Sequence, residues 1–253
     1  MNQGIGKFPV TPHRLQGDDL QWMQLALGQA QEAARAGEVP IGAVLVREGE
    51  LLAKAHNTPI STHNPCAHAE IKAIEEACQR VQDYRLGTKV TLYVTLQPCI
   101  MCLGAILHAR IGRVVIGCPQ SRFNDLKDSL ELFDRNEAWH PCKFETGCMQ
   151  EECQQVLSGF FQQRRQSRVQ SLEQLESLLH LPNVNKQTQL LLNAMGYESG
   201  ADIVKVGLDK AAQDMHQIAL EHKAQGHVQQ AAIFESLQDF FKGEPAKSWK
   251  HYV

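Results

Sequence analysis

The sequence predicts a mixed α/β domain followed by a smaller all-helical region. Along residues 19–168, apolar residues alternate between helical spacing and the compact runs typical of buried strands. All eight cysteines lie before residue 155, and the 7 basic and 10 acidic residues of 171–253 account for the whole net charge of -3. We therefore expect an N-terminal arm over 1–18, a three-layer α/β/α domain over 19–168 with a mixed central sheet of about five strands, and an all-α C-terminal extension over 171–253.

The first half of the domain predicts a helix, a hairpin and a second helix. Apolar residues recur at helical spacing over about 19–36, behind two aspartates that favour a helix start. The stretch "PIGAVLVREGELLAKAHN" (40–57) is typical of two strands joined at Gly49, because glycine readily takes the positive φ of a tight hairpin. The stretch "AHAEIKAIEEACQRV" (67–81) returns to helical spacing.

The second half continues the alternation. A β-rich run, "KVTLYVTL" (89–96), precedes the apolar helix "CIMCLGAILHARI" (99–111), and "RVVIGC" (113–118) is another buried strand. After a loop, "CKFETG" (142–147) predicts a last strand and "MQEECQQVLSGFFQQRR" (149–165) a last helix. Such alternation predicts a sheet covered by helices.

Composition excludes several classes of protein. The sequence has no 18-residue apolar run and no apolar core of a signal peptide near its start, so we expect a cytoplasmic protein without a membrane span. In such a chain, eight cysteines indicate reduced thiols and metal ligands rather than disulfides. The slightly negative net charge disfavours a broad basic surface for nucleic acid, although a local basic patch is compatible with it.

Two short motifs carry the residues of a metal site. His68 and Glu70 fall in the first turn of one predicted helix, and "PCIMC" opens another directly after a strand. Pro98 suits that position, since the first helical N–H groups have no acceptor within the helix. Cys99 and Cys102, three residues apart, face the same side of the helix, where its positive N-terminus favours thiolates. Two thiolates and an imidazole form a three-ligand zinc set that leaves a fourth position for water, as in catalytic sites.

The motifs H-A-E and P-C-I-M-C resemble those of the zinc-dependent cytidine-deaminase superfamily. Longer stretches are similar to the bacterial tRNA adenosine deaminases, which form inosine at the wobble position. These are "EVPIGAVLV", "AHNTPISTHNPCAHAEI", "LYVTLQPCIMCLGAILHARIGRVVIG" and "EECQQVLSGFFQQRR". The resemblance covers about residues 19–168.

The resemblance implies a role for each residue that matches the family motif. His68, Cys99 and Cys102 would bind one zinc ion per subunit, and Glu70 would carry protons while zinc-bound hydroxide attacks C6 of adenine. Asn57 would bind the base, and the backbone amides of Ala69 and Cys99 would hold the reacting oxygen. The resemblance also implies a homodimer with tRNA as partner.

Other interpretations of the same residues remain open. Cys66 would complete a closed structural zinc site, as in a non-catalytic binding protein built on a deaminase scaffold. Asn57, before Pro59, is also an ordinary turn residue. A free nucleobase or nucleoside, such as guanine, cytosine or adenosine, is the alternative substrate.

The chain departs from the tRNA enzymes near the substrate. Pro119 and Gln120 replace a charged arginine–aspartate pair, and Trp139 replaces an asparagine that precedes a histidine. Gln120 and Trp139 are therefore candidate substrate-binding residues, Trp139 by stacking on a base, although it would equally well cover the edge of the core. Arg164 and Arg165 are candidate RNA-binding residues at a helix end, where arginines are also common without a ligand.

The extension over 171–253 has helical spacing interrupted at glycines and a proline, which predicts three or four helices. Residues 181–196 faintly resemble a helix-hairpin-helix, but the usual Gly-x-Gly turn is replaced by "NVN". A packing module or a surface for a protein partner is the favoured interpretation.

Overall fold

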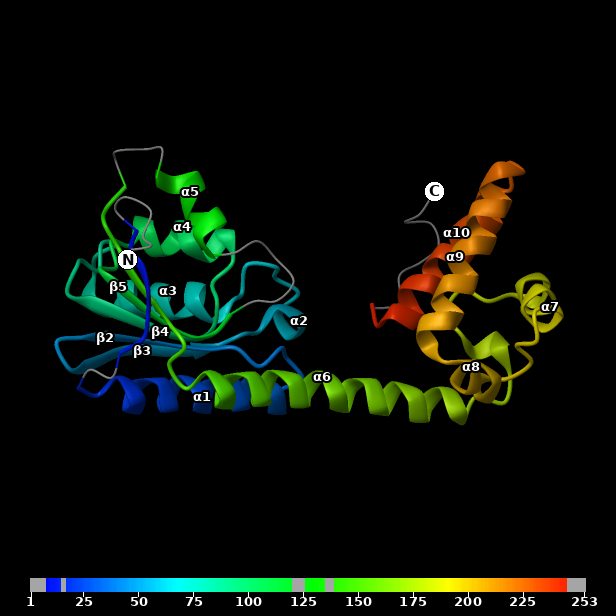
Figure 1. Ribbon diagram of the computed structural model, residues 1–253, viewed down its shortest axis with the longest axis horizontal. Coiled ribbons are helices and arrows are strands. Elements are labelled where there is room, and N and C mark those ends of the chain that lie inside the picture. The colour runs from blue at the N-terminus through cyan, green and yellow to red at the C-terminus, as the bar shows by residue number, and fades with distance from the viewer. Residues whose placement is uncertain (1–7, 15–16, 120–125, 135–138, 245–253) are drawn as a thin grey trace. The chain divides into compact units, whose positions relative to one another are not determined.

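The computed structural model describes residues 8–14, 17–119, 126–134 and 139–244 of the chain (Figure 1). Its contacts divide the chain into two compact units, residues 1–161 and 162–253. The division falls within one continuous helix, α6 (Gln150–Glu173). No helix in the described ranges is long and apolar enough to cross a membrane.

The first unit is built on a mixed sheet of six strands in the order β1-β6-β5-β4-β2-β3. Strands β1, β6, β5 and β4 run parallel, whereas β2 is antiparallel to both β4 and β3. Their bounds, in chain order, are Val10–Pro12, Gly42–Arg47, Glu50–His56, Val90–Leu96, Arg113–Cys118 and Lys143–Thr146. The mixed α/β fold expected from the sequence is confirmed. The sheet has one strand more than expected, because β1 in the N-terminal arm pairs with β6.

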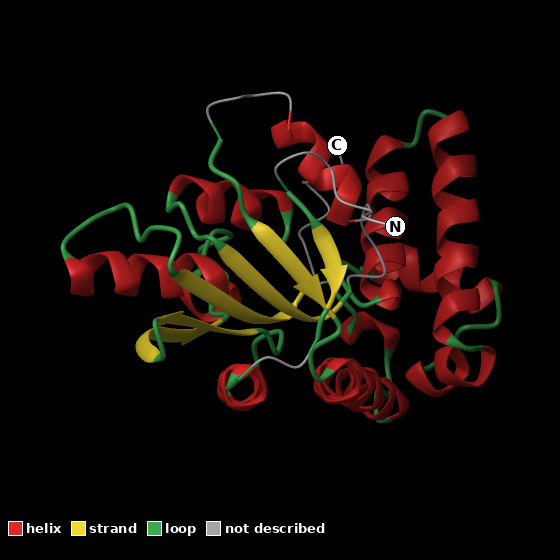
Figure 2. Ribbon diagram, turned by 60° about the vertical axis from the view of Figure 1, so that its left-hand side comes forward, coloured by secondary structure: helices red, strands yellow, loops and turns green. Residues whose placement is uncertain are grey.

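Helices cover both faces of this sheet (Figure 2). Helix α1 (Asp19–Arg35) packs on one face, and α3 (Ala69–Val81) and α4 (Ile100–His108) pack together on the other. Alternate residues of the strands point to the two faces: Leu45 joins the core beneath α3 and α4, and Val44 joins the core beneath α1. Two further helices of this unit are α2 (Pro59–Thr62) and α5 (Leu126–Asp134).

Two glycines explain local features of the sheet. Glu48 and Gly49 both have positive φ, 51° and 84°, and form the two-residue turn between β2 and β3, as the sequence predicts. Gly117 in β5 permits a close approach of α6, because a Cβ at this position would lie 2.4 Å from the Cys153 Sγ. Helix α6 is therefore seated directly on the sheet.

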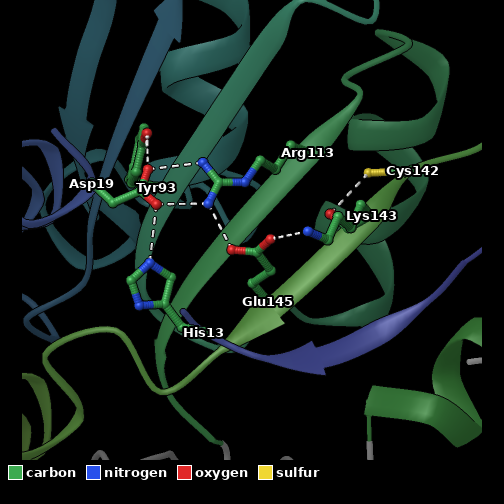
Figure 3. A network of polar contacts seen from close by, with 7 residues as sticks. All are labelled: His13, Asp19, Tyr93, Arg113, Cys142, Lys143 and Glu145. Atoms are coloured by element: carbon green, nitrogen blue, oxygen red, sulfur yellow. Dashed lines mark hydrogen bonds and ion pairs between the residues drawn. The ribbon is translucent and has the colours of Figure 1, made fainter. Parts of the chain in front are cut away.

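A buried ion-pair network ties α1 to the sheet (Figure 3). Asp19, in the first turn of α1, accepts hydrogen bonds from both terminal nitrogens of Arg113, at 2.8 and 2.7 Å, and from the Tyr93 hydroxyl at 2.6 Å. Arg113 also donates to Glu145 at 2.6 Å, and the His13 ring lies 3.0 Å from Asp19. The Arg113 guanidinium thus pairs with both carboxylates, and Lys143 forms a further ion pair with Glu145. The helix starts at these aspartates as expected, with Asp18 at the N-cap position, although its side chain makes no cap hydrogen bond.

The second unit is helical, as the sequence predicts. After α6, the residues described up to 244 form a short 3-10 helix and four α-helices, with bounds η1 Leu178–His180, α7 Lys186–Ala194, α8 Gly200–Val206, α9 Leu208–Ala224 and α10 Val228–Lys242. Leu192, Met215 and Phe234 are among the buried residues of its own apolar core. Each unit therefore has a separate core.

Candidate metal and active site

Three potential metal ligands meet where two helices begin. His68 is the N-cap residue of α3, Cys99 is the N-cap residue of α4, and Cys102 lies in the first turn of α4. The His68 Nδ1 is 3.6 Å from the Cys99 Sγ and 3.5 Å from the Cys102 Sγ, and the two sulfurs are 3.6 Å apart. Zn–S bonds of about 2.3 Å and Zn–N bonds of about 2.0 Å at tetrahedral angles separate ligand atoms by roughly 3.5 to 3.8 Å. The cluster therefore has the dimensions of a zinc site.

The fold brings these ligands together because α3 and α4 begin beside each other. Strand β4 ends at Leu96, and the chain turns through Pro98 directly into α4. Helices α3 and α4 pack against each other, so their N-termini are neighbours. Hydrogen bonds with Cys102 and His68 lower the pKa of Cys99 to about 4, which favours the thiolate that binds a metal.

Protons and a metal compete for this cluster. The hydrogen bond with Cys99, followed by burial and the nearby Glu70, raises the pKa of Cys102. The hydrogen bond with Cys99 also raises the pKa of His68. A metal ion displaces these protons when it binds, since its ligands must be deprotonated.

Glu70 is a buried carboxylate beside the ligands. Its side chain is 3% exposed and contacts the Cys102 thiol. Burial is the main cause that raises its pKa, followed by repulsion from Cys99. Its Oε2 atom has no hydrogen-bond partner among the described residues. A buried carboxylate oxygen requires a donor, and water on the open position of a three-ligand metal site would supply it, so the residues fit a catalytic zinc ion.

Asn57 holds the start of α3 in place. This residue follows β3 and is 3% exposed, and its Oδ1 atom accepts a hydrogen bond from the Ala69 N–H at 2.8 Å. The Ala69 N–H has one hydrogen to donate, and here it goes to Asn57 rather than outward to a ligand. The two candidates that the resemblance assigned to substrate binding are thus hydrogen-bonded to each other.

Glu38 fixes the loop between Asn57 and His68, and the sequence patterns did not identify it. This carboxylate is fully buried and accepts from the backbone N–H groups of Ile60 at 3.0 Å and Ser61 at 2.6 Å. Burial alone would raise the pKa of Glu38, but these hydrogen bonds hold it below its ordinary value. The only signal available in the sequence is a glutamate placed directly before an apolar strand, which does not identify its partners.

Of the other predicted substrate residues, Trp139 lies in the first unit, Arg164 and Arg165 belong to the second unit, and one is outside the described residues. Gln120 lies outside the described residues, and the neighbouring Pro119 is exposed at the end of β5. Trp139 precedes β6 and packs edge-on against His108, the last residue of α4, with ring centroids 4.7 Å apart. It therefore lies at the opposite end of α4 from Cys99. Arg164 and Arg165 are exposed on α6, in the second unit.

Cys66 is exposed and does not join His68, Cys99 and Cys102 in the group of ligand atoms that lie within 4.8 Å of one another. Within the part of the chain that the structure describes, the cluster therefore lacks the fourth protein ligand that a closed structural site needs. Four further cysteines of this unit are buried: Cys118, Cys142, Cys148 and Cys153.

Comparison with known proteins places this geometry in a family. Residues 17–165 match the family model described as MafB19-like deaminase. A tRNA-specific adenosine deaminase of Haemophilus influenzae is 40% identical over 161 residues, which cover 63% of this chain and 92% of that protein. A tRNA-specific adenosine deaminase of Bacillus subtilis is 39% identical over 150 residues, which cover 59% of this chain and 92% of that protein.

Solved structures agree with these relatives. A structure from a study of A-to-I editing by tRNA:A34 deaminases is 36% identical, with a TM-score of 0.51 over 54% of this chain and 99% of that chain. A guanine deaminase from Nitrosomonas europaea, 18% identical, shares the fold with a TM-score of 0.50 over 59% of this chain and 87% of that chain. The second unit lies almost entirely beyond the matched residues. Through residues 17–165, which carry the ligand cluster and Glu70, the chain belongs to the MafB19-like deaminase family, in the group that includes the tRNA-specific adenosine deaminases.

Proposed function

We propose that this protein is a zinc-dependent hydrolytic deaminase that converts adenosine to inosine at the wobble position of tRNA. The observation that carries the proposal is the cluster of His68, Cys99 and Cys102 beside the buried Glu70, whose Oε2 has no partner among the described residues. The names of the relatives support tRNA as the substrate. When bound, zinc would supply an activated water and a positive charge.

Glu70 moves the protons of the proposed reaction. Its carboxylate accepts a proton from the attacking water and returns protons to N1 of adenine and to the departing amine, so that water and adenosine yield inosine and ammonia. A raised pKa suits this work, because the carboxylate must both accept and release protons near neutral pH.

Asn57 binds the base through its amide nitrogen. Since its Oδ1 accepts from Ala69, the NH2 group is the part of the side chain available to donate to an acceptor on adenine. The hydrogen bond to Ala69 also fixes the amide relative to His68, the residue that precedes Ala69.

The proposed function is tested with the whole chain and a Glu70→Gln variant. We expect the wild-type protein to form inosine in a tRNA arginine anticodon stem-loop, and the variant to keep its zinc but lose activity by a factor of about 10² to 10⁴. Equal activity of the two proteins would contradict the role of Glu70. Loss of zinc from the variant would instead assign Glu70 to metal binding.

The second candidate function is deamination of a free nucleobase or nucleoside. The departure that favours it is Pro119, which together with Gln120 replaces the charged pair of the tRNA enzymes. Ammonia release from guanine, cytidine and adenosine, measured beside the stem-loop, separates the two functions. Release from a free base without inosine in RNA would overturn the tRNA proposal.

A homodimer in the cytoplasm completes the proposal, as the resemblance to the tRNA enzymes implies. Sedimentation velocity of the purified chain tests the dimer. A protein partner for the helices of the second unit remains a prediction, which capture with the whole chain as bait and identification of the bound protein would test.

A further inference from the structure

A groove of about 670 Å³ lies on the deaminase unit away from the ligand cluster. It is formed by the segment after α3, the end of α4 and the segment before β6, and the side chains that matter are Tyr84, Arg85, His108, Arg110, Trp139 and His140. The catalytic residues do not line it.

The groove is positively charged. Arg85 and Arg110 are both exposed, His108 and His140 add nitrogen donors or acceptors, and none of the described residues that line it is acidic. The nearest acid along the chain, Asp83, has a carboxylate oxygen that accepts the Arg85 backbone N–H at 3.0 Å. This local charge differs from the net charge of the chain, which is -3.

The two arginines are held near each other by the backbone. The N–H of Leu86 donates to the carbonyl of Ala109 at 2.8 Å, so the residues next to this bond, Arg85 and Arg110, lie on adjoining segments. Leu86 and Ala109 are buried, 4% and 3% exposed, which anchors both segments in the core. The backbone that carries both arginines is therefore held in a fixed position.

Aromatic rings accompany the charges. Tyr84 is 67% exposed, and the Arg85 guanidinium lies 4.9 Å from the centre of its ring. Trp139 packs edge-on against His108 and Phe133, which fixes its ring at the groove. Exposed aromatic rings interleaved with arginines are typical of surfaces that bind unpaired nucleotides, since bases stack on the rings and phosphates pair with the arginines.

The groove and the ligand cluster lie at opposite ends of α4. This helix begins after Cys99 and ends at His108, a length of about 13 Å at 1.5 Å per residue. A nucleoside at the metal site does not span that distance, whereas a polynucleotide does. We propose that the groove binds the phosphate backbone and an unpaired base of the RNA substrate outside the nucleotide that is deaminated. This inference rests on the proposed function, which it extends from the target adenosine to a longer RNA.

Two double variants of equal charge test the inference. The groove variant, Arg85→Ala with Arg110→Ala, removes the two arginines of the groove. The control variant, Arg35→Ala with Lys54→Ala, removes one exposed charge from α1 and one from the edge strand β3. Each is made in the Glu70→Gln background so that tRNA is bound but not consumed. We expect the groove variant to bind tRNA about tenfold more weakly and to reduce the slope of log Kd against log salt by about 1.5, as two lost phosphate contacts require. The control variant should bind tRNA as the parent does.

Stacking is tested separately at Tyr84. Tyr84→Ala should weaken tRNA binding about fivefold or more, and Tyr84→Phe should restore it, because the ring rather than the hydroxyl stacks on a base. Release of ammonia from free adenosine, measured in chains that keep Glu70, should be the same in groove variants and wild type.

Other outcomes overturn the inference. Equal binding by the groove and control variants would show that the groove does not contact RNA. A groove variant that loses its dimer in sedimentation velocity would assign the groove to a second copy of the chain. If either of these two results is obtained and the wild-type protein still forms inosine, the inference about the groove fails and the proposed function stands. If the groove variant loses RNA binding but wild-type protein forms no inosine, the inference stands and the proposed function fails.

Discussion

The Oδ1 atom of Asn57 lies 2.8 Å from the backbone nitrogen of Ala69 and accepts its hydrogen bond. This contact joins the end of β3 to the first residue of α3, directly after His68. One side chain therefore both positions a metal-ligand segment and presents an amide at the proposed substrate site.

Replacing Asn57 with Ala should reduce stability as well as activity. The variant leaves the buried Ala69 N–H without its acceptor, which costs about 1 to 3 kcal/mol of unfolding free energy. Urea unfolding measures this loss, and inosine formation measures the loss of the donor to the base. Asn57→Asp keeps an acceptor for Ala69 but removes the NH2 donor, so it should retain more stability than the Ala variant while remaining inactive. Wild-type activity in the Asp variant would contradict the role of the NH2 group.

Zinc content should separate Cys102 from Cys66. Cys102→Ser should release zinc from the purified protein because a hydroxyl is a poor replacement for the thiolate. Cys66→Ser should retain the zinc content of the wild type, since Cys66 does not belong to the ligand group. Metal analysis after dialysis measures both. Loss of zinc from the Cys66 variant would indicate that Cys66 is a fourth ligand in a closed structural site.

Glu38→Gln should loosen the loop that precedes His68. A glutamine offers one acceptor oxygen for two backbone N–H groups, and its NH2 group faces the second of them, so a loss of about 1 to 3 kcal/mol is expected. Hydrogen exchange at the amides of residues 60–62 should become faster, and thermal unfolding should occur at a lower temperature. Glu50→Gln, at an exposed position on β3, is the matched control and should change neither. Unchanged exchange in the Glu38 variant would show that the carboxylate does not hold the loop.

Ionised Asp19 should contribute to the unfolding free energy in a way that depends on pH. Burial opposes its charge, but hydrogen bonds from Arg113, Tyr93 and His13 lower its pKa to about 2. Because the folded pKa lies below the unfolded value of about 3.9, the stabilisation is present above pH 4 and is lost as pH falls toward 2. This term is on the order of 2 kcal/mol.

The comparison of wild type with Asp19→Asn measures that term. The difference in unfolding free energy between the two proteins should be largest at neutral pH and should decrease below pH 4. Asp18→Asn is the control, because Asp18 is exposed and makes no side-chain cap bond. A difference between wild type and the Asp19→Asn variant that stays constant from pH 7 to pH 3 would rule out the proposed electrostatic origin.

The two leucines of α7 test the core of the second unit. Leu192 is 1% exposed and Leu190 is 69% exposed. Leu192→Ala should destabilise the second unit by about 2 to 5 kcal/mol, and Leu190→Ala should change its stability by less than about 0.5 kcal/mol. Limited proteolysis should then cut the second unit of the Leu192 variant while its zinc content stays normal. Loss of zinc in that variant would show that the two units do not fold separately.

The sequence predicts the elements that depend on local pattern. The helix expected over about 19–36 is observed as Asp19–Arg35, and the hairpin turn falls at Gly49. His68 and Cys99 begin helices as expected, because a helix start is marked by nearby residues and needs no distant partner. That the two helix starts meet was implied by the resemblance to the deaminases and not by the local pattern, because His68 and Cys99 are 31 positions apart.

Features that depend on distant partners were not predictable. Asp19 reaches Arg113 across 94 positions, and Glu38 reaches Ser61 across 23, so neither carboxylate shows its burial in its own neighbourhood. Strand β1 has three residues and pairs with β6 near the other end of the unit, too short for a periodicity to mark it. Helix α6 continues past the arginines expected to end it, to Glu173, because Leu172 packs in the core of the second unit.

The short β1 strand affects how the deaminase unit should be isolated. The family match begins at residue 17, and a fragment that starts there omits Val10–Pro12 and His13. In such a fragment, β6 becomes an edge strand with unpaired backbone N–H and C=O groups, which promotes pairing with other chains. It also removes the His13 contact with Asp19. A stable preparation of this unit therefore has to begin before Phe8, whose side chain is fully buried in the core of the sheet.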